Sequence, residues 1–233
     1  MRTLVLWDID HTLIDVAGIS REIYSAVFRD FVGRLPEKFP DMSGRTDRGI
    51  ITALLDLNDV PRTDDLVETF AEALAAMFED RRHEFTARGR ELTGGRAALA
   101  ALAKRTDVVQ SVLTGNMKPI AICKLTEFGL HEFVDFEVGA YGLDGLERPA
   151  LVRFARERAQ AKFGETFDEH GTVLIGDTPH DVQAGHEGGA RVVAVATGRS
   201  DAAALRAAGA ELVLPDLGDT DAVIRSILQV SDE

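Results

Sequence analysis

The sequence predicts an α/β fold, a Rossmann-like parallel sheet with helices on both faces and an all-helical cap inserted into it. Short, near-continuous apolar runs alternate with longer helical patterns, which is typical of strands covered on both sides. Such alternation favours parallel strands joined by right-handed crossovers. The stretch from about residue 15 to 91 breaks the rhythm, because it holds no convincing strand.

Six apolar runs are expected to form the strands of the sheet. Most of them are separated by segments of helical pattern, so each strand and the helix after it form one βαβ repeat. The runs are Leu4 to Trp7, Val108 to Leu113, Phe133 to Val138, Val173 to Ile175, Val192 to Ala196 and Leu212 to Leu214.

The interrupted stretch is predicted to be a helical bundle. A first helix carries one apolar face with four-residue spacing, formed by Ile19, Ile23, Val27 and Phe31. A second helix is expected over residues 48–57. A third begins near Asp65, where Asp65 and Glu68 have the spacing of a capping box. Its apolar stripe is formed by Leu66, Phe70, Leu74 and Met77.

These elements divide the chain into two parts. We assign residues 1–14 and 92–233 to an α/β core and residues 15–91 to the helical cap. The insertion comes after the first strand, so it lies at the carboxyl edge of the sheet, where α/β proteins place their ligands. The natural interpretation of such a module is a lid over a site.

Composition narrows the class of partner. The net charge is −13 and the sequence pI is about 4.9, so the surface repels nucleic acid and anionic membranes. No segment approaches the roughly 20 apolar residues that a membrane span needs. The single cysteine, Cys123, cannot form an internal disulfide, which fits the reducing cytoplasm. Composition leaves open whether the protein is a monomer or a homodimer.

Polar and acidic groups follow three of the predicted strands. They are Asp8, Asp10 and Thr12 after the first run, Thr114 and Asn116 after the run at 108–113, and Asp177 and Asp181 after the run at 173–175. In a parallel sheet these groups meet in one crevice. Clustered carboxylates repel one another, and oxygen ligands without a cysteine or histidine pair favour Mg²⁺. Any one of these acids alone could equally cap a helix.

With these residues in place, the chain resembles the haloacid dehalogenase-like hydrolases, most closely the phosphoglycolate-phosphatase-like branch with a helical cap. The motif Asp-x-Asp-x-Thr is matched at Asp8 to Thr12, and the Ser or Thr that ends the next core strand is matched by Thr114. The acidic pair after a glycine is matched by Asp177 and Asp181, which follow Gly176.

The resemblance implies a magnesium-dependent phosphatase acting on a small phosphorylated metabolite through an aspartyl-phosphate. Asp8 would be the nucleophile, and Asp10 would protonate the leaving oxygen and then activate water. Mg²⁺ would be held by Asp8, Asp177 and the main-chain carbonyl of Asp10, with Asp181 orienting its surroundings. The phosphate oxygens would be bound by Thr114, Gly115, Asn116 and the first loop at His11 and Thr12.

Two positions depart from the family pattern. The usual lysine before the last motif is replaced by Arg148, followed by Pro149, and Arg keeps the charge but not the geometry of Lys. Lys118 is the alternative for that role and is also a candidate to bind the phosphate. His11 stands where glycine is common, and either a substrate contact or simple exposure would explain it.

The cap is expected to choose the substrate. The polar loop around Arg45 and Thr46 joins two cap helices, and in related capped enzymes this loop dips into the site. An ordinary turn before a helix is the competing interpretation. A phosphosugar mutase, a 2-haloacid dehalogenase and a non-catalytic phospholigand sensor are the rival functions, and dehalogenation ranks low because it gives Asp10 no task.

Overall fold

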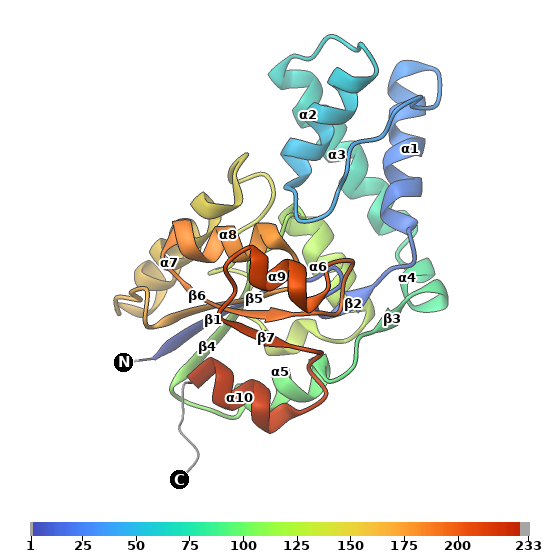
Figure 1. Cartoon of the computed structure of the whole chain (residues 1–233). Helices are drawn as coiled ribbons and strands as arrows, with labels where there is room; N and C mark the ends of the chain where they lie inside the picture. Colours follow the sequence, from blue (N-terminus) through green and yellow to red (C-terminus); the bar gives the residue numbers. More distant parts are fainter. Residues whose placement is uncertain (1, 229–233) are drawn as a thin grey trace.

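A five-stranded parallel sheet forms the centre of the molecule in the computed structural model, which describes residues 2–228 (Figure 1). The strand order is β4-β1-β5-β6-β7, so β1 lies between two strands that come much later in the chain. The pairings Trp7 with Val112 and Trp7 with Ile175 bring three strand ends level. The strands are β1 (Thr3–Trp7), β4 (Val108–Val112), β5 (Thr172–Gly176), β6 (Arg191–Val195) and β7 (Leu212–Leu214).

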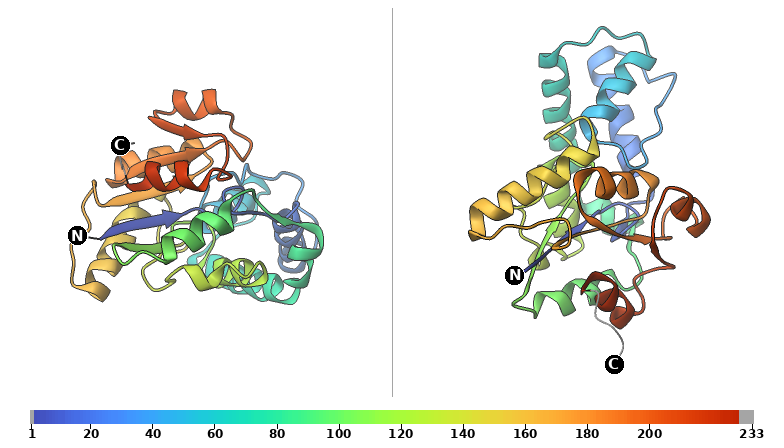
Figure 2. Two further views of the ribbon diagram at one scale, coloured as in Figure 1. Left: turned by 90° about the horizontal axis from the view of Figure 1, so that it is seen from below. Right: turned by 60° about the vertical axis from the view of Figure 1, so that its left-hand side comes forward.

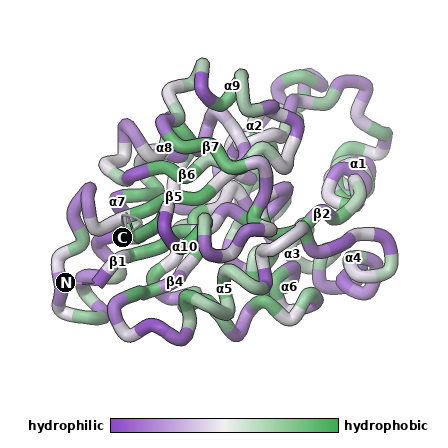
Figure 3. The backbone as a smooth tube through the Cα atoms, turned by 60° about the horizontal axis from the view of Figure 1, so that its bottom comes forward, coloured by the Kyte–Doolittle hydropathy of each residue, from purple (hydrophilic) through white to green (hydrophobic). Residues whose placement is uncertain are grey.

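Helices cover both faces of this sheet, as predicted. Leu4 and Leu6 of β1 pack into a cluster with α7 and α8, whereas Val5 and Trp7 face the cluster of α5 and α10. The two layers can be followed in Figure 2. Figure 3 shows the strands as the apolar centre of the chain, which explains why their runs read as near-continuous. These helices are α5 (Gly95–Ala103), α6 (Lys118–Glu127), α7 (Arg148–Phe163), α8 (Pro179–Gly188), α9 (Ala202–Ala207) and α10 (Thr220–Leu228).

The predicted strand at residues 133–138 is wrong. A short 3-10 turn, η1 (His131–Phe133), leads into irregular chain beside β4. The Asp135 carboxylate accepts the Glu137 N–H at 3.0 Å, and a side chain that closes such a local turn competes with strand pairing. The Asp135 N–H still reaches the Gln110 carbonyl at 2.8 Å, so the segment covers the edge of β4 without extending the sheet.

The inserted helices stand together above the carboxyl edge of the sheet (Figure 1). The chain enters and leaves them through a two-stranded antiparallel ribbon, in which Ile14 pairs with Glu91. The sequence offered no signal for strands of two residues. The elements are β2 (Ile14–Asp15), α1 (Ile19–Val32), α2 (Asp47–Leu57), α3 (Asp64–Asp80), α4 (His83–Arg88) and β3 (Arg90–Glu91).

The helices predicted for the insertion agree with the observed helices to within a few residues. Helix α3 begins at Asp64 because the Thr63 hydroxyl accepts the Leu66 N–H at 3.2 Å, so the capping box expected at Asp65 is wrong. The apolar face of α1 is buried except at Phe31, which is 39% exposed and packs on the Phe70 ring. Within residues 2–228, no helix has the length and apolar character that crossing a membrane requires.

Candidate active site

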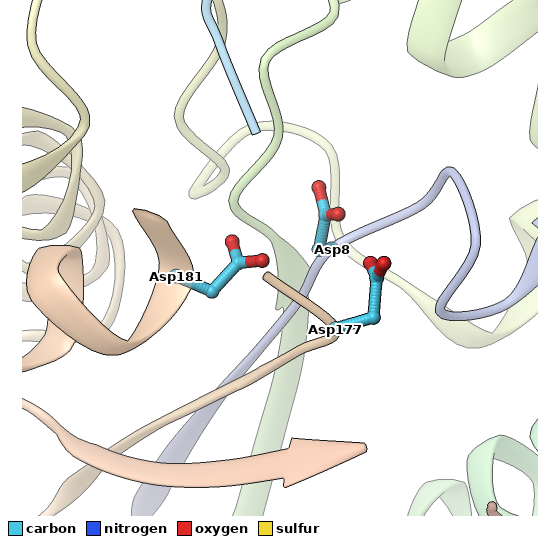
Figure 4. A group of neighbouring side chains, drawn as sticks. All are labelled: Asp8, Asp177 and Asp181. Carbon is cyan, nitrogen blue, oxygen red and sulfur yellow. The ribbon is translucent and has the colours of Figure 1, made fainter. Parts of the chain in front are cut away.

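Three carboxylates meet at the carboxyl edge of the sheet, as the strand-end argument predicted. Asp8 follows β1, Asp177 follows β5, and Asp181 lies in the first turn of α8. Each offers an oxygen within 4.8 Å of the other two, and all three side chains face a common space (Figure 4). All three are buried, so their charges cannot be screened by water.

The local sequence fixes Asp181 at this place. Thr178 and Asp181 form a reciprocal capping box at the start of α8: the Thr178 hydroxyl accepts the Asp181 N–H, and the Asp181 carboxylate accepts the Thr178 N–H at 3.0 Å. Gly176 makes room for this carboxylate, because a Cβ there would lie 2.3 Å from the Asp181 carboxyl carbon. The glycine before the acidic pair is therefore a requirement of close approach.

Arg148 is the positive charge of this cluster. Its guanidinium donates to Asp8 at 3.1 Å and also to Asp181, and its side chain is only 5% exposed. The N-terminal end of α7 carries it there. The structure thus places Arg148, and not Lys118, against the nucleophile candidate. Lys118 lies over the Tyr141 ring, outside the residues that line the central cavity, so its position does not support a phosphate contact.

One guanidinium does not neutralise the cluster. Burial raises the pKa of Asp8 to about 7 despite Arg148, with repulsion from Asp181 and Asp10 adding to the rise. Burial and the Asp8 charge raise the pKa of Asp177 to about 8. Buried acids with raised pKa values call for either protons or a cation.

A divalent cation fits the oxygens that are left. Both Asp181 oxygens already accept hydrogen bonds from Arg148 and Thr178. Arg148 donates to Asp8 Oδ1 and Thr12 donates to Asp177 Oδ1 at 3.1 Å, and no described side chain is shown donating to Oδ2 of either residue. Hard carboxylate oxygens of this kind suit a metal such as Mg²⁺. The cluster can therefore hold a divalent metal, with Asp181 beside it.

Asp10 is turned away from this cluster toward a buried lysine. Lys124 of α6 donates to both Asp10 oxygens at 2.8 and 2.7 Å, and Asn116 donates to one of them at 2.7 Å. Burial pushes the pKa of Asp10 up, but the Lys124 charge and these hydrogen bonds outweigh it and hold that pKa below its ordinary value. Asp10 is therefore a carboxylate in the resting site.

Some of the residues predicted to bind phosphate line the cavity, whereas others are buried or use their polar groups elsewhere. Thr114, Gly115 and Asn116 line the cavity, and Thr114 Oγ1 accepts from the Asn116 amide at 2.9 Å. Thr12 is fully buried, and its hydroxyl donates a hydrogen bond to Asp177. His11 lines the cavity with a left-handed φ of 63°, but its N–H donates to the Ile14 carbonyl at 2.7 Å.

The cap loop is seated on the core beside this cavity. The Asp47 N–H donates to the Gly115 carbonyl at 2.7 Å, and Arg48 N–H donates to the Gly142 carbonyl at 3.2 Å. Gly115 must lack a side chain, because a Cβ would lie 2.0 Å from the Arg45 carbonyl oxygen. Arg45 lines the cavity, whose volume is about 430 Å³. Thr46 is buried, caps α2 and donates to the Leu146 carbonyl at 3.0 Å. Its hydroxyl therefore links the cap to the core and does not point to a substrate contact.

Sequence reasoning missed a buried polar group on each side of this interface. Asp47 accepts from the Tyr24 hydroxyl at 2.6 Å and from the Met117 N–H at 2.7 Å, and burial raises its pKa to about 6. Its position at the start of a helix made it look like an ordinary capping acid. Lys124 could have been recognised from the sequence, because it lies inside an apolar helical stretch. A lysine that is buried in such a stretch almost always has a charged or polar partner.

Comparison with known proteins identifies the family and the fold of the chain. The family model of the haloacid dehalogenase-like hydrolases matches residues 5–186. CbbY from Rhodobacter sphaeroides, solved in complex with phosphate, is 19% identical over 94% of this chain and 96% of its own, with a TM-score of 0.70. A predicted phosphatase from Clostridium acetobutylicum is 19% identical over 99% and 100%, with a TM-score of 0.67.

A predicted phosphoglycolate phosphatase from Haemophilus somnus is 18% identical over 96% of this chain and 98% of its own, with a TM-score of 0.64. At these identities the solved structures establish a common fold. Among curated proteins, no sequence matches the chain significantly. The family model spans most of the chain, from β1 into α8, and confirms the family indicated by the motifs. The chain belongs to the haloacid dehalogenase-like hydrolases.

Proposed function

We propose that this protein is a magnesium-dependent phosphatase that releases phosphate from a small phosphorylated metabolite. The observation that carries the proposal is the buried pairing of Asp8 with Arg148 at the floor of a cavity that also receives Asp10. Asp8 supplies a nucleophile, Arg148 offsets the charge of an incoming phosphoryl group, and Asp10 supplies a second carboxylate for proton transfer.

Asp8 attacks phosphorus in line and forms an aspartyl-phosphate. Asp10 gives a proton to the leaving oxygen and then takes one from the water that hydrolyses the intermediate. The resting carboxylate is the form that the second step requires, and a bound phosphate dianion raises the proton affinity of Asp10 for the first. Thr114, Gly115 and Asn116 line the cavity where the phosphate oxygens would lie. Such displacement depends mainly on positioning and charge stabilisation.

Mg²⁺ would be held by carboxylate oxygens of Asp8 and Asp177, together with the Asp10 carbonyl. When bound, it supplies positive charge that offsets the repulsion between nucleophile and phosphate. Asp181 keeps Arg148 in place through the hydrogen bond between them. The clustering of these carboxylates supports this assignment, and so do the raised pKa values of Asp8 and Asp177, because a cation lowers the cost of burying two charges.

A small anionic substrate fits the charges that line the cavity. Arg21, Arg45 and Arg199 line it along with Arg148, so the cavity carries basic as well as acidic side chains in a protein that is acidic as a whole. CbbY was also solved with xylulose 1,5-bisphosphate, and that complex is 19% identical to this chain with a TM-score of 0.71. We propose Arg45 of the cap as a residue that contacts the part of the substrate beyond the transferred phosphate.

The test is phosphate release from a panel of phosphorylated metabolites, with and without millimolar Mg²⁺. Asp8→Asn should abolish turnover while leaving the circular dichroism spectrum unchanged, and the exposed Asp221→Asn should behave as wild type. Acid-quenched wild-type enzyme should carry a phosphoryl adduct on the peptide that contains Asp8. Release of free phosphate, as opposed to transfer of the phosphoryl group back to the bound sugar, separates a phosphatase from a mutase. Full turnover by Asp8→Asn would remove the proposed nucleophile.

A further inference from the structure

Lys124 carries a buried charge, and the reaction steps proposed above assign it no role. It lies in the middle of α6, its residue exposure is 1%, and its ammonium is 5.3 Å from the centre of the Phe78 ring of the cap helix α3. Burying an ammonium group is unfavourable unless every N–H finds a partner. The partners of Lys124 therefore indicate what the residue is for.

The ammonium of Lys124 donates to Asp10 and to Asn116, a residue that itself contacts Asp10. Two hydrogen bonds go directly to Asp10 Oδ1 and Oδ2, at 2.8 and 2.7 Å. The third goes to Asn116 Oδ1 at 2.8 Å. Because an ammonium can only donate, it fixes the orientation of the Asn116 amide, whose Nδ2 then donates to Asp10 at 2.7 Å. Lys124 thus holds Asp10 both directly and through Asn116.

Stability alone does not explain this pair. The Asp10 side chain is 32% exposed and lines the cavity, so water could solvate it without a buried partner. Lys124, in contrast, loses nearly all its hydration, and a buried ion pair often stabilises a fold no better than apolar residues of similar volume. What the pair provides is a carboxylate with one fixed direction, facing the cavity.

We propose that Lys124 is the positioning residue for Asp10, holding its carboxylate, together with Asn116, where it exchanges protons with the leaving oxygen and the attacking water. This inference rests on the proposed phosphatase function. A displacement of a reacting group by about 1 Å can reduce a rate by about a hundredfold, so losing the three hydrogen bonds should have an effect of that size. In this proposal Lys124 acts through Asp10, because its three hydrogen bonds go to Asp10 and Asn116.

The experiment is a double-mutant cycle on phosphate release, with Lys124→Met, Asp10→Asn and the double variant. Rates are measured with saturating Mg²⁺, and with enzyme in excess where turnover is slow. Lys124→Met alone should lower kcat by about a hundredfold, while KM changes less than about threefold. In the Asp10→Asn background the same change should lower the rate by less than about twofold, because the group that it positions is already gone.

Two controls separate positioning from damage to the fold. Lys104→Met removes an exposed lysine after α5, before the chain enters β4, and should keep wild-type rates. Melting temperature and inhibition by inorganic phosphate show whether Lys124→Met is folded with an intact phosphate site. If it does not fold, Lys124→Gln takes its place in the cycle, because an amide keeps most of the stem and one donor group.

Three results would overturn the inference while leaving the phosphatase proposal intact. They are an unchanged kcat in Lys124→Met, an equal loss in both backgrounds of the cycle, and a loss confined to KM. The proposed function itself fails on a different result, which is that the wild-type protein releases phosphate from no monoester.

Discussion

Magnesium binding should strengthen steeply as pH rises, because the carboxylates proposed to hold the ion bind protons in its absence. The pKa values of Asp8 and Asp177 are raised to about 7 and about 8 from an ordinary value of 3.8. At pH 6 both protons must leave before the ion can bind. Competition of this kind weakens binding by about tenfold at Asp8 and about a hundredfold at Asp177. Between pH 6 and pH 9 we expect the apparent affinity to rise by about two to three orders of magnitude.

The same shifts set the sign of the stability change without the ion. A carboxyl with a raised pKa in the folded state favours folding when it is protonated, and this contribution is lost as pH rises through the folded pKa. Without Mg²⁺ the melting temperature should therefore fall between pH 5 and pH 8.5, whereas saturating Mg²⁺ should remove much of that fall.

Isothermal titration calorimetry at several pH values measures the affinity, and buffers of different ionisation enthalpy count the protons released. Thermal unfolding at the same pH values gives the stability. Asp177→Asn should weaken binding and remove much of the proton release, and the exposed Asp221→Asn should change neither. An affinity that is independent of pH, with no proton release, would refute the assignment of the ion to Asp8 and Asp177.

Two further predictions concern buried groups beside the cavity. Arg148→Met should destabilise the protein by about 3–5 kcal/mol at pH 8, because it leaves the carboxylates of Asp8 and Asp181 without their cation, and by less at pH 5, where protons can replace it. Urea denaturation at both pH values tests this, and equal losses would contradict it. Asp47→Leu should cost about 1–3 kcal/mol for each of the donors, Tyr24 and Met117, that it leaves buried. A loss of less than 1 kcal/mol in urea denaturation would show that water satisfies both donors.

The sequence was most informative about features that follow from the residue pattern of a single strand or helix. Five of the six apolar runs are strands of the sheet, because strands covered on both faces are mostly apolar, although β4 also buries Gln110 and Ser111. Their ends then located Asp8 and Asp177, since the residues after parallel strands lie along a single edge of the sheet. The strand predicted at 133–138 is absent because Asp135 and Glu137 interrupt the apolar run, and the Asp135 carboxylate closes a turn by accepting the Glu137 N–H.

The contacts that cross between cap and core could not be predicted in the same way. Asp47 and Tyr24 belong to different helices of the insertion, and Met117 belongs to a core loop, so no spacing relates them. Lys124 lies 8 residues after Asn116, beyond the polar motif, and only the packing of α6 brings its ammonium under Asp10. Pairings of this kind depend on how separate elements dock, which local patterns do not record.

The way in which the cap loop meets the core has a consequence for how selectivity can change. The loop is joined to the core partly by main-chain atoms: the N–H groups of Asp47 and Arg48 donate to glycine carbonyls, and the Arg45 carbonyl fills the space left free at Gly115. Among residues 2–228, no hydrogen bond or ion pair from the Arg45 side chain contributes to that attachment. A substitution of Arg45 can therefore change which side-chain groups contact the substrate while the loop keeps its position. Substrate selectivity can then change without moving the catalytic residues of the core.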